Sequence, residues 1–383
     1  MTDGAALIGL DPLTGGALRV SHSSGTITDI ETLPPDAAAP DVYLSPGLID
    51  IQVNGYAGYD LNAGVVTVGT VVGLVQSLRP VGTLVFMPTL VTASEGFLLD
   101  TLSTIATARR SDPDLAHAMP RIHIEGPWIS AEDGARGAHA AEHVRPPDIA
   151  EFERWQRAAG GIIGMVTLSP HYEQAPAVTA ELVARGVVVA IGHTTASDAQ
   201  IEAVIRAGAQ LSTHLGNGIA MTLKRHPNPI WTQLGHDKLQ ASLIADGFHL
   251  APSVFRSILR AKGLERTILV SDSARPAGLP PGQYHSHAGL LELTPEGRLG
   301  IAGTEYLAGS GVNLAQCVAR AVNMGSISLA EALSLATRNP GRLLNIGGRL
   351  AIGASADLLT FRWTEQAPTL EIVNVVANGK SVQ

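Results

Sequence analysis

Cysteine and lysine are scarce in this chain of 383 residues. The single cysteine, Cys317, excludes an intrachain disulfide and a cysteine-rich metal site. Only four lysines are present, so arginine carries most of the positive charge. The formal net charge of -8 supplies no broad basic surface, and we therefore expect no nucleic-acid partner.

The chain also lacks a long hydrophobic run. Its start, Met1-Thr2-Asp3-Gly4, has neither the positive charge nor the apolar core of a signal peptide, and no apolar run is long enough to span a membrane. A soluble cytoplasmic protein with no membrane partner is therefore expected. Hydrophobic residues make up 45% and charged residues only 16%, which favours a buried parallel sheet over disorder.

Eight short apolar runs alternate with amphipathic stretches along the middle of the chain. Strands that alternate with helices predict βαβ units and a parallel sheet. Eight units predict an α/β fold, a closed (β/α)8 TIM-like barrel with its active site at the C-terminal strand ends. The predicted strands are residues 48–55, 81–91, 121–126, 162–170, 187–193, 209–215, 239–247 and 266–272; the predicted helices are 65–78, 97–109, 148–159, 178–185, 197–207 and 252–262.

The two ends of the chain do not follow this period. Residues 1–47 and 350–383 resemble short strands, with Asn378-Gly379 as a hairpin signal. We expect both termini to form a small β-sandwich domain beside a barrel of residues 48–349. We also expect helices at 312–324 and 329–336, and the second helix should end before Pro340. Segment 278–298 should form an irregular hairpin over the site.

Four functional side chains end apolar runs three, five, six and eight: Glu125, His193, His214 and Asp272. Two histidines and one glutamate are a common ligand set for catalytic zinc, which keeps one position open for water. A surface or hydrogen-bonded histidine is the simpler alternative for each imidazole. Glu125 has an alternative as a helix cap or ion-pair partner, although a glutamate in an apolar strand needs a strong partner.

Asp272 follows the apolar run Thr267-Ile268-Leu269-Val270. A buried carboxylate near an activated water can take its proton and pass it to a leaving amine. The alternative is a helix cap or a loop turn.

The motifs that carry this pattern also resemble a known family. The first strand ends in Gln52-Val53-Asn54, where the amidohydrolase superfamily usually has His-x-His. In its full set of motifs the chain resembles the N-acetylglucosamine-6-phosphate deacetylase family over nearly its whole length. The motifs are His123-Ile124-Glu125-Gly126-Pro127, Gly137-Ala138-His139, Gly192-His193-Thr194, Thr213-His214-Leu215, Ala245-Asp246-Gly247-Phe248-His249 and Ser271-Asp272.

This resemblance implies a role for each matching residue in the chemistry. One divalent metal ion, most simply zinc, is implied because Gln52 and Asn54 replace His-x-His, with Gln52 holding the metal-bound water. Asp272 matches the general base and acid, and His139 matches the histidine at the substrate carbonyl and developing oxyanion. The implied metal ligands are Glu125, His193 and His214.

The resemblance also implies contacts to the substrate. His249 matches a histidine in the sugar-phosphate pocket, and Asn217 and Gly218 match the turn that offers donors to the phosphate. Arg225 matches an arginine that reaches the phosphate of a neighbouring subunit, which implies a homodimer.

Two other metal arrangements are less favoured by the residues. His139 and His143 are four apart and could form a second metal pair on a helix, but segment 130–145 reads as a loop. Asp246 ends a strand, and we interpret Asp246-Gly247 as a turn that holds His249.

The implied function is metal-dependent hydrolysis of the N-acetyl group of a small amino-sugar substrate, N-acetylglucosamine 6-phosphate in the first instance. A different or unphosphorylated N-acyl sugar is the alternative, because the residues around the expected phosphate turn, such as Gly216, depart from the family pattern. A non-catalytic sugar-binding barrel and a cyclic-amide hydrolase are disfavoured, the first by the intact Glu125, His193, His214 and Asp272 and the second by Gln52 and Asn54.

Overall fold

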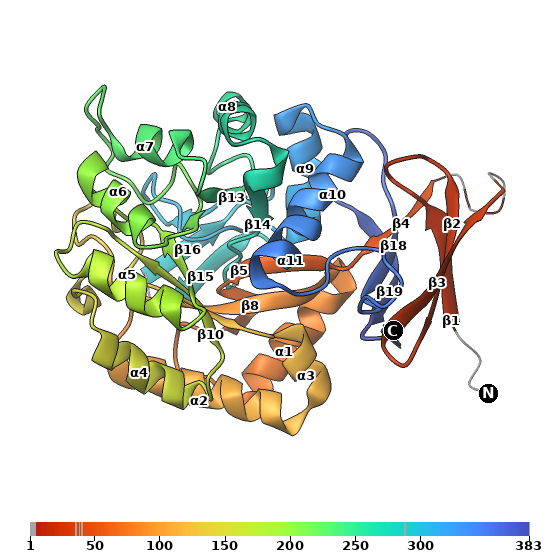
Figure 1. Cartoon of the computed structure of the whole chain (residues 1–383), viewed down its shortest axis with the longest axis horizontal. Coiled ribbons are helices and arrows are strands. Elements are labelled where there is room, and N and C mark those ends of the chain that lie inside the picture. The colour runs from red at the N-terminus through yellow and green to blue at the C-terminus, as the bar shows by residue number, and fades with distance from the viewer. Residues whose placement is uncertain (1–4, 35–36, 38, 40, 287–288, 383) are drawn as a thin grey trace.

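The computed structural model describes residues 5–34, 37, 39, 41–286 and 289–382, and a parallel barrel is its largest unit (Figure 1). The barrel closes between the last strand and the first, where the Asp272 amide donates to the Gln52 carbonyl at 3.1 Å. Each strand lies within one predicted range, so the barrel prediction is confirmed. The strands, paired in chain order, are β5 (Leu48–Val53), β8 (Thr83–Val91), β9 (Ile122–Glu125), β10 (Ile163–Leu168), β11 (Val188–Ile191), β12 (Leu211–Ser212), β13 (Gln240–Ile244) and β14 (Thr267–Val270).

Helices cover the outside of the barrel (Figure 1). Eight overlap the predicted ranges: α1 (Val68–Leu78), α2 (Glu95–Ser111), α4 (Ile149–Ala158), α5 (Ala175–Ala184), α6 (Asp198–Arg206), α8 (Pro252–Lys262), α9 (Leu314–Gly325) and α10 (Leu329–Ala336). Three short helices were not predicted: α3 (Pro113–Ala118), α7 (Pro229–Gly235) and α11 (Arg338–Leu344). The 3-10 turns are η2 (Arg79–Val81), η3 (Ala141–His143) and η4 (Leu264–Arg266).

Strands from the two ends of the chain form one seven-stranded mixed sheet in the order β20-β19-β18-β4-β1-β2-β3. Val20, Leu44 and Leu358 belong to a common buried core within this sheet, in keeping with the predicted sandwich-like unit. Figure 1 places the sheet at one end of the barrel. Its strands are β1 (Ala5–Leu10), β2 (Ala17–Ser23), β3 (Thr26–Leu33), β4 (Val42–Pro46), β18 (Leu358–Arg362), β19 (Glu371–Ala377) and β20 (Lys380–Val382).

A small antiparallel sheet lies over the carboxyl rim of the barrel. It contains β15 (Gly282–Ser286), β16 (Gly289–Leu293) and β17 (Leu299–Ile301), and it is more regular than the hairpin predicted there. Its buried leucines pack against Ala138 and Ala274, next to candidate site residues. A short pair, β6 (Gly55–Tyr56) and β7 (Tyr59–Asp60), follows the first barrel strand. Among the described residues, no helix is both long and apolar enough to span a bilayer.

Candidate active site

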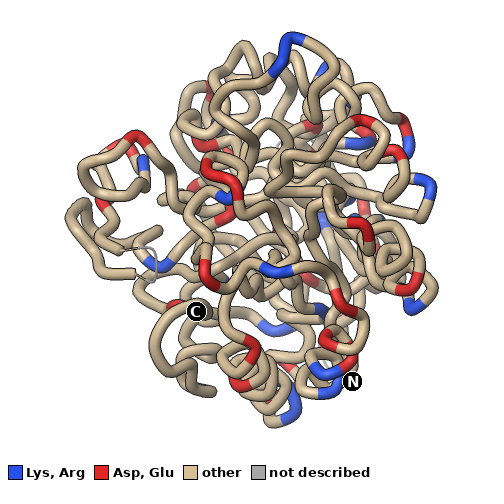
Figure 2. Tube along the Cα trace, turned by 90° about the vertical axis from the view of Figure 1, so that its left-hand side faces the viewer, with Lys and Arg blue, Asp and Glu red and all other residues tan. Residues whose placement is uncertain are grey.

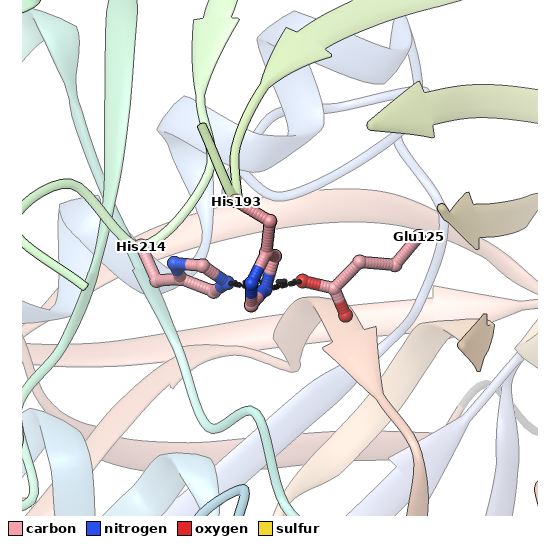
Figure 3. Close-up of side chains that lie close together, drawn as sticks. All are labelled: Glu125, His193 and His214. Carbon is pink, nitrogen blue, oxygen red and sulfur yellow. Dashed lines mark hydrogen bonds and ion pairs between the residues drawn. The ribbon is translucent and has the colours of Figure 1, made fainter. Parts of the chain in front are cut away.

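Three side chains converge at the C-terminal ends of β9, β11 and β12 (Figure 3). Glu125 Oε1 lies 3.2 Å from His193 Nε2 and 2.9 Å from His214 Nε2, and the two imidazole nitrogens are 3.1 Å apart. All three side chains are buried. Within the described part of the chain they are the one cluster of this kind whose ligand atoms all lie close enough to hold a metal ion.

The tautomer of His193 supports a cation at this point. Its Nδ1 lies 2.9 Å from the Ala135 carbonyl, which only accepts, so Nδ1 carries the proton of the neutral ring. The Nε2 atom then directs a lone pair at His214 Nε2 and at the Glu125 carboxylate. Such converging electron-rich atoms repel one another unless a positive charge lies between them, and the donor set therefore fits a divalent metal.

Three residues of the site adopt strained backbone conformations. His193, His214 and Asp272 have φ values of 47°, 32° and 50°, in the left-handed region that non-glycine residues rarely adopt. Gly218, at φ 61°, lies so close to the His193 ring that a Cβ there would be 2.9 Å from Nδ1. The strand ends are thus turned sharply to aim side chains inward, as strained functional residues commonly are.

Asp272 lies beside this cluster and is only 8% exposed. Burial and the charge of Glu125 raise its pKa to about 7, although a hydrogen bond from Asn54 Nδ2 at 2.7 Å acts in the opposite sense. Burial also opposes ionisation of Glu125, but the adjacent His193 and His214 rings favour the carboxylate more strongly and hold that pKa well below its usual range. Two neighbouring carboxyl groups therefore differ in proton affinity, the property a general base needs beside an ionised ligand.

Gln52 and Asn54 reach the site from the end of the first strand. Gln52 Nε2 donates to Glu125 Oε1 at 3.0 Å, and Asn54 donates to Asp272. Both are neutral amides at the positions where His-x-His was absent from the sequence. The structure thus places each amide against an acidic side chain of the site.

His139 also faces the cluster, with its Nε2 at 3.2 Å from His193 Nε2. The Thr92 amide donates to His139 Nδ1 at 3.3 Å, so the neutral ring carries its proton on Nε2. That nitrogen can donate to an oxygen atom bound near the cluster. The segment around it is a loop with one 3-10 turn, Ala141–His143, rather than a helix that would pair His139 with His143.

A cavity of about 600 Å³ opens above these side chains. It is lined by Glu125, His139, His193, His214, Asp272, Asn54, Asn217, Gly218 and His249. Gln52 is buried and bonded to Glu125, but it does not itself line the cavity. Arg225 is exposed and does not line the cavity of its own chain.

Two residues that the structure brings to the site had no predicted functional role. Asp246 was expected only to form a turn, but it also accepts a hydrogen bond from His249 at 2.7 Å. Arg275 lines the cavity from the loop after β14. Its position three residues after Asp272 was the only available signal, and loop side chains have no periodicity from which to predict their direction.

Comparison with known proteins places this site in a family. A sequence model of the amidohydrolase family matches residues 43–382. An N-acetylglucosamine-6-phosphate deacetylase of Bacillus subtilis is 30% identical over 352 residues, which cover 89% of this chain and 87% of the relative. The chain belongs to the amidohydrolase family, among the N-acetylglucosamine-6-phosphate deacetylases.

Two further similarities support this membership in the amidohydrolase family. The N-acetylglucosamine-6-phosphate deacetylase of Bos taurus is 33% identical over 331 residues, covering 82% of this chain and 78% of the relative. A solved structure of a mutant N-acetyl-D-glucosamine-6-phosphate deacetylase of Mycobacterium smegmatis, in complex with N-acetyl-D-glucosamine-6-phosphate, has a TM-score of 0.85 and 30% identity. It covers 95% of this chain and 94% of that chain.

Proposed function

We propose that this amidohydrolase removes the N-acetyl group of N-acetylglucosamine 6-phosphate, giving glucosamine 6-phosphate and acetate. The observation that carries the proposal is the meeting of Glu125, His193 and His214 with buried Asp272 at one cavity. The names of the relatives give the same reaction. The cavity volume of about 600 Å³ is within the range of small-molecule sites.

We propose Glu125, His193 and His214 as the ligands of one zinc ion, because two imidazole nitrogens and a carboxylate oxygen suit zinc and leave a position open. A bound zinc ion would activate water and polarise the amide carbonyl. Gln52, hydrogen-bonded to Glu125, would help to hold that water.

The proton transfers are assigned to Asp272. Its raised pKa suits a group that takes a proton from the attacking water and returns it to the leaving amine. The Nε2–H group of His139 would donate a hydrogen bond to the oxyanion that forms on the acetyl carbonyl oxygen. The products are then acetate and the free amino sugar, with Asp272 ready for another cycle.

We further propose that Asn217, Gly218 and His249 bind the sugar phosphate, since all three line the cavity. Arg225 would serve the cavity of a second copy, because it is exposed and outside its own. This requires a homodimer. A phosphorylated sugar crosses membranes poorly, so a cytoplasmic location fits this substrate.

Replacing Asp272 tests the mechanism. We expect Asp272→Asn to lower kcat by about 10²- to 10⁴-fold, the usual contribution of a general base, while zinc content and fold stay unchanged. Acetate release from N-acetylglucosamine 6-phosphate measures the effect. Glu305→Gln, at the cavity rim, is the matched control and should retain activity. Near-normal turnover by the Asp272 variant would contradict the assignment of Asp272 as the general base.

Metal removal tests the zinc assignment. Chelation should abolish acetate release, and added zinc should restore it.

A change of substrate tests the preference for the phosphate. N-acetylglucosamine without the phosphate should be a much poorer substrate. Equal rates on the two sugars would instead favour the second candidate, a deacetylase of unphosphorylated N-acyl sugars, which the position of Arg225 outside the cavity also suits.

A further inference from the structure

The charge of the cavity wall poses a problem for an anionic substrate. Four carboxylates line the cavity, whereas a sugar phosphate carries nearly two negative charges. In the view of Figure 2, Lys and Arg are interspersed with Asp and Glu along the trace, and the formal net charge of the chain is -8. Among the described residues that line the cavity, Arg275 is the only lysine or arginine; the carboxylates are Asp60, Glu125, Asp272 and Glu305.

The backbone of Arg275 is firmly placed. It lies in the loop after β14, where its carbonyl accepts a hydrogen bond from the Gly58 amide at 2.9 Å. A Cβ on Gly55 would lie 3.1 Å from the Arg275 nitrogen, so the two loops are in close contact. The Arg275 side chain therefore extends from a backbone position that is fixed between the first and last strands of the barrel.

The side chain of Arg275 extends to the small sheet over the rim. Its Nη1 donates to the His285 carbonyl at 3.0 Å, next to Ser286, which also lines the cavity. The residue is only partly buried. A guanidinium has five N–H donors in a fixed fork, so one bond to a carbonyl leaves donors for an anion.

We propose that Arg275 is a specificity-determining residue that contacts the anionic group of the substrate from within the same chain. This inference rests on the proposed function and refines it. It differs from the role of Arg225, which is exposed, lies outside this cavity and would need a second copy. A lone subunit would then retain part of its preference for a phosphorylated sugar.

Steady-state kinetics of the full-length zinc-loaded enzyme test this role. We expect Arg275→Gln to raise KM for N-acetylglucosamine 6-phosphate about tenfold or more, as expected for a lost charge-assisted contact, with kcat little changed. KM for unphosphorylated N-acetylglucosamine should not rise. Arg275→Lys should recover part of the loss, because it keeps the charge.

Arg298→Gln is the matched control. Arg298 also holds the small sheet, through the Glu305 carbonyl at 3.1 Å, but it does not line the cavity. If Arg275 only supports the sheet, both variants will impair both sugars alike, and the proposal is overturned. A normal KM for the phosphorylated sugar in Arg275→Gln overturns it equally.

Failure of the proposed function would look different. Wild-type enzyme that hydrolyses both sugars equally, or neither, refutes the substrate assignment whatever Arg275 does. The binding of inorganic phosphate, measured by calorimetry, then tests the contact between Arg275 and an anion independently of turnover. Weaker binding to Arg275→Gln than to Arg298→Gln supports it, and equal binding refutes it.

Discussion

Asp246 lies just after β13 and uses both carboxylate oxygens locally. Oδ1 accepts from the Phe248 and His249 amides at 2.8 and 2.9 Å, and Oδ2 pairs with His249 Nδ1 at 2.7 Å. Burial favours neutral His249, but the bond to Asp246 outweighs this and raises its pKa. Because Nδ1 is held by the carboxylate, Nε2 is the nitrogen left for substrate.

At the residue scale, we expect Asp246→Asn to weaken binding of the phosphorylated sugar. The amide keeps the turn but removes the charge that raises the pKa of His249, so the imidazolium is lost at lower pH. KM should then begin to rise at lower pH than in wild type. At neutral pH it should be about tenfold higher, the value of one charge-assisted hydrogen bond.

The pH dependence of KM between mildly acidic and mildly basic solution checks this expectation. His249→Gln is the control, because it should remove this pH dependence altogether. An Asp246→Asn profile that overlays the wild-type profile would show that Asp246 serves only the turn.

At the element scale, the three helices that were not predicted share one property, their short length. α3, α7 and α11 have six or seven residues, too few for a clear apolar period. α10 ends at Ala336, before Pro340, as predicted. The chain then breaks at Thr337 and begins α11, and Pro340 lies in the first turn of this new helix, where no intrahelical amide bond is lost.

α3 is tied to the terminal sheet by an ion pair. His117 Nε2 lies 2.8 Å from Asp357 Oδ2, and this contact raises the pKa of His117 above its ordinary 6.5. Burial opposes ionisation of Asp357, but the bond to His117 lowers its pKa below 3.8. The Ser355 hydroxyl and the Asn378 amide also donate hydrogen bonds to the Asp357 carboxylate.

The pair should therefore stabilise the fold most in mildly acidic solution. Its contribution is complete below the ordinary histidine pKa of 6.5 and is lost as pH rises through the raised folded-state value. At the acid end it persists until pH falls through the lowered pKa of Asp357. We expect His117→Asn to cost on the order of 1 kcal/mol in this window and less at alkaline pH.

Urea unfolding of wild type and His117→Asn at pH 5.5 and pH 9 measures the difference. His226→Asn, at an exposed loop position, is the control. A cost that is equal at both pH values would rule out the ion pair as its source.

At the scale of the whole molecule, the terminal sheet and the barrel share a core. Phe361 of β18 is fully buried, stacks on Tyr43 with ring centroids 5.8 Å apart, and belongs to the same apolar cluster as Leu48 and Leu84 of the barrel. We propose that 1–47 and 350–383 form one domain and 48–349 the other, with stability that depends on both.

Phe361→Ala should consequently destabilise the whole protein. The loss of a buried phenylalanine leaves a cavity and costs about 3–5 kcal/mol. We expect a single unfolding transition at lower urea concentration, because the cluster spans both units. The half-buried Phe97 on α2 provides the control, and its replacement by Ala should cost clearly less. A separate early transition would show instead that the terminal sheet unfolds independently.

By itself the sequence determined the eight strands, the Asn378-Gly379 turn and the residue types at the strand ends. These follow from local periodicity and turn chemistry, which nearby residues encode. Only the tertiary structure decided that Glu125 and His214, 89 positions apart, lie at hydrogen-bonding distance. It also decided the His193 tautomer, the hold of Asp246 on His249 and the presence of Arg275 in the cavity wall. Barrel closure and loop packing set these contacts, and both depend on residues far apart in the chain.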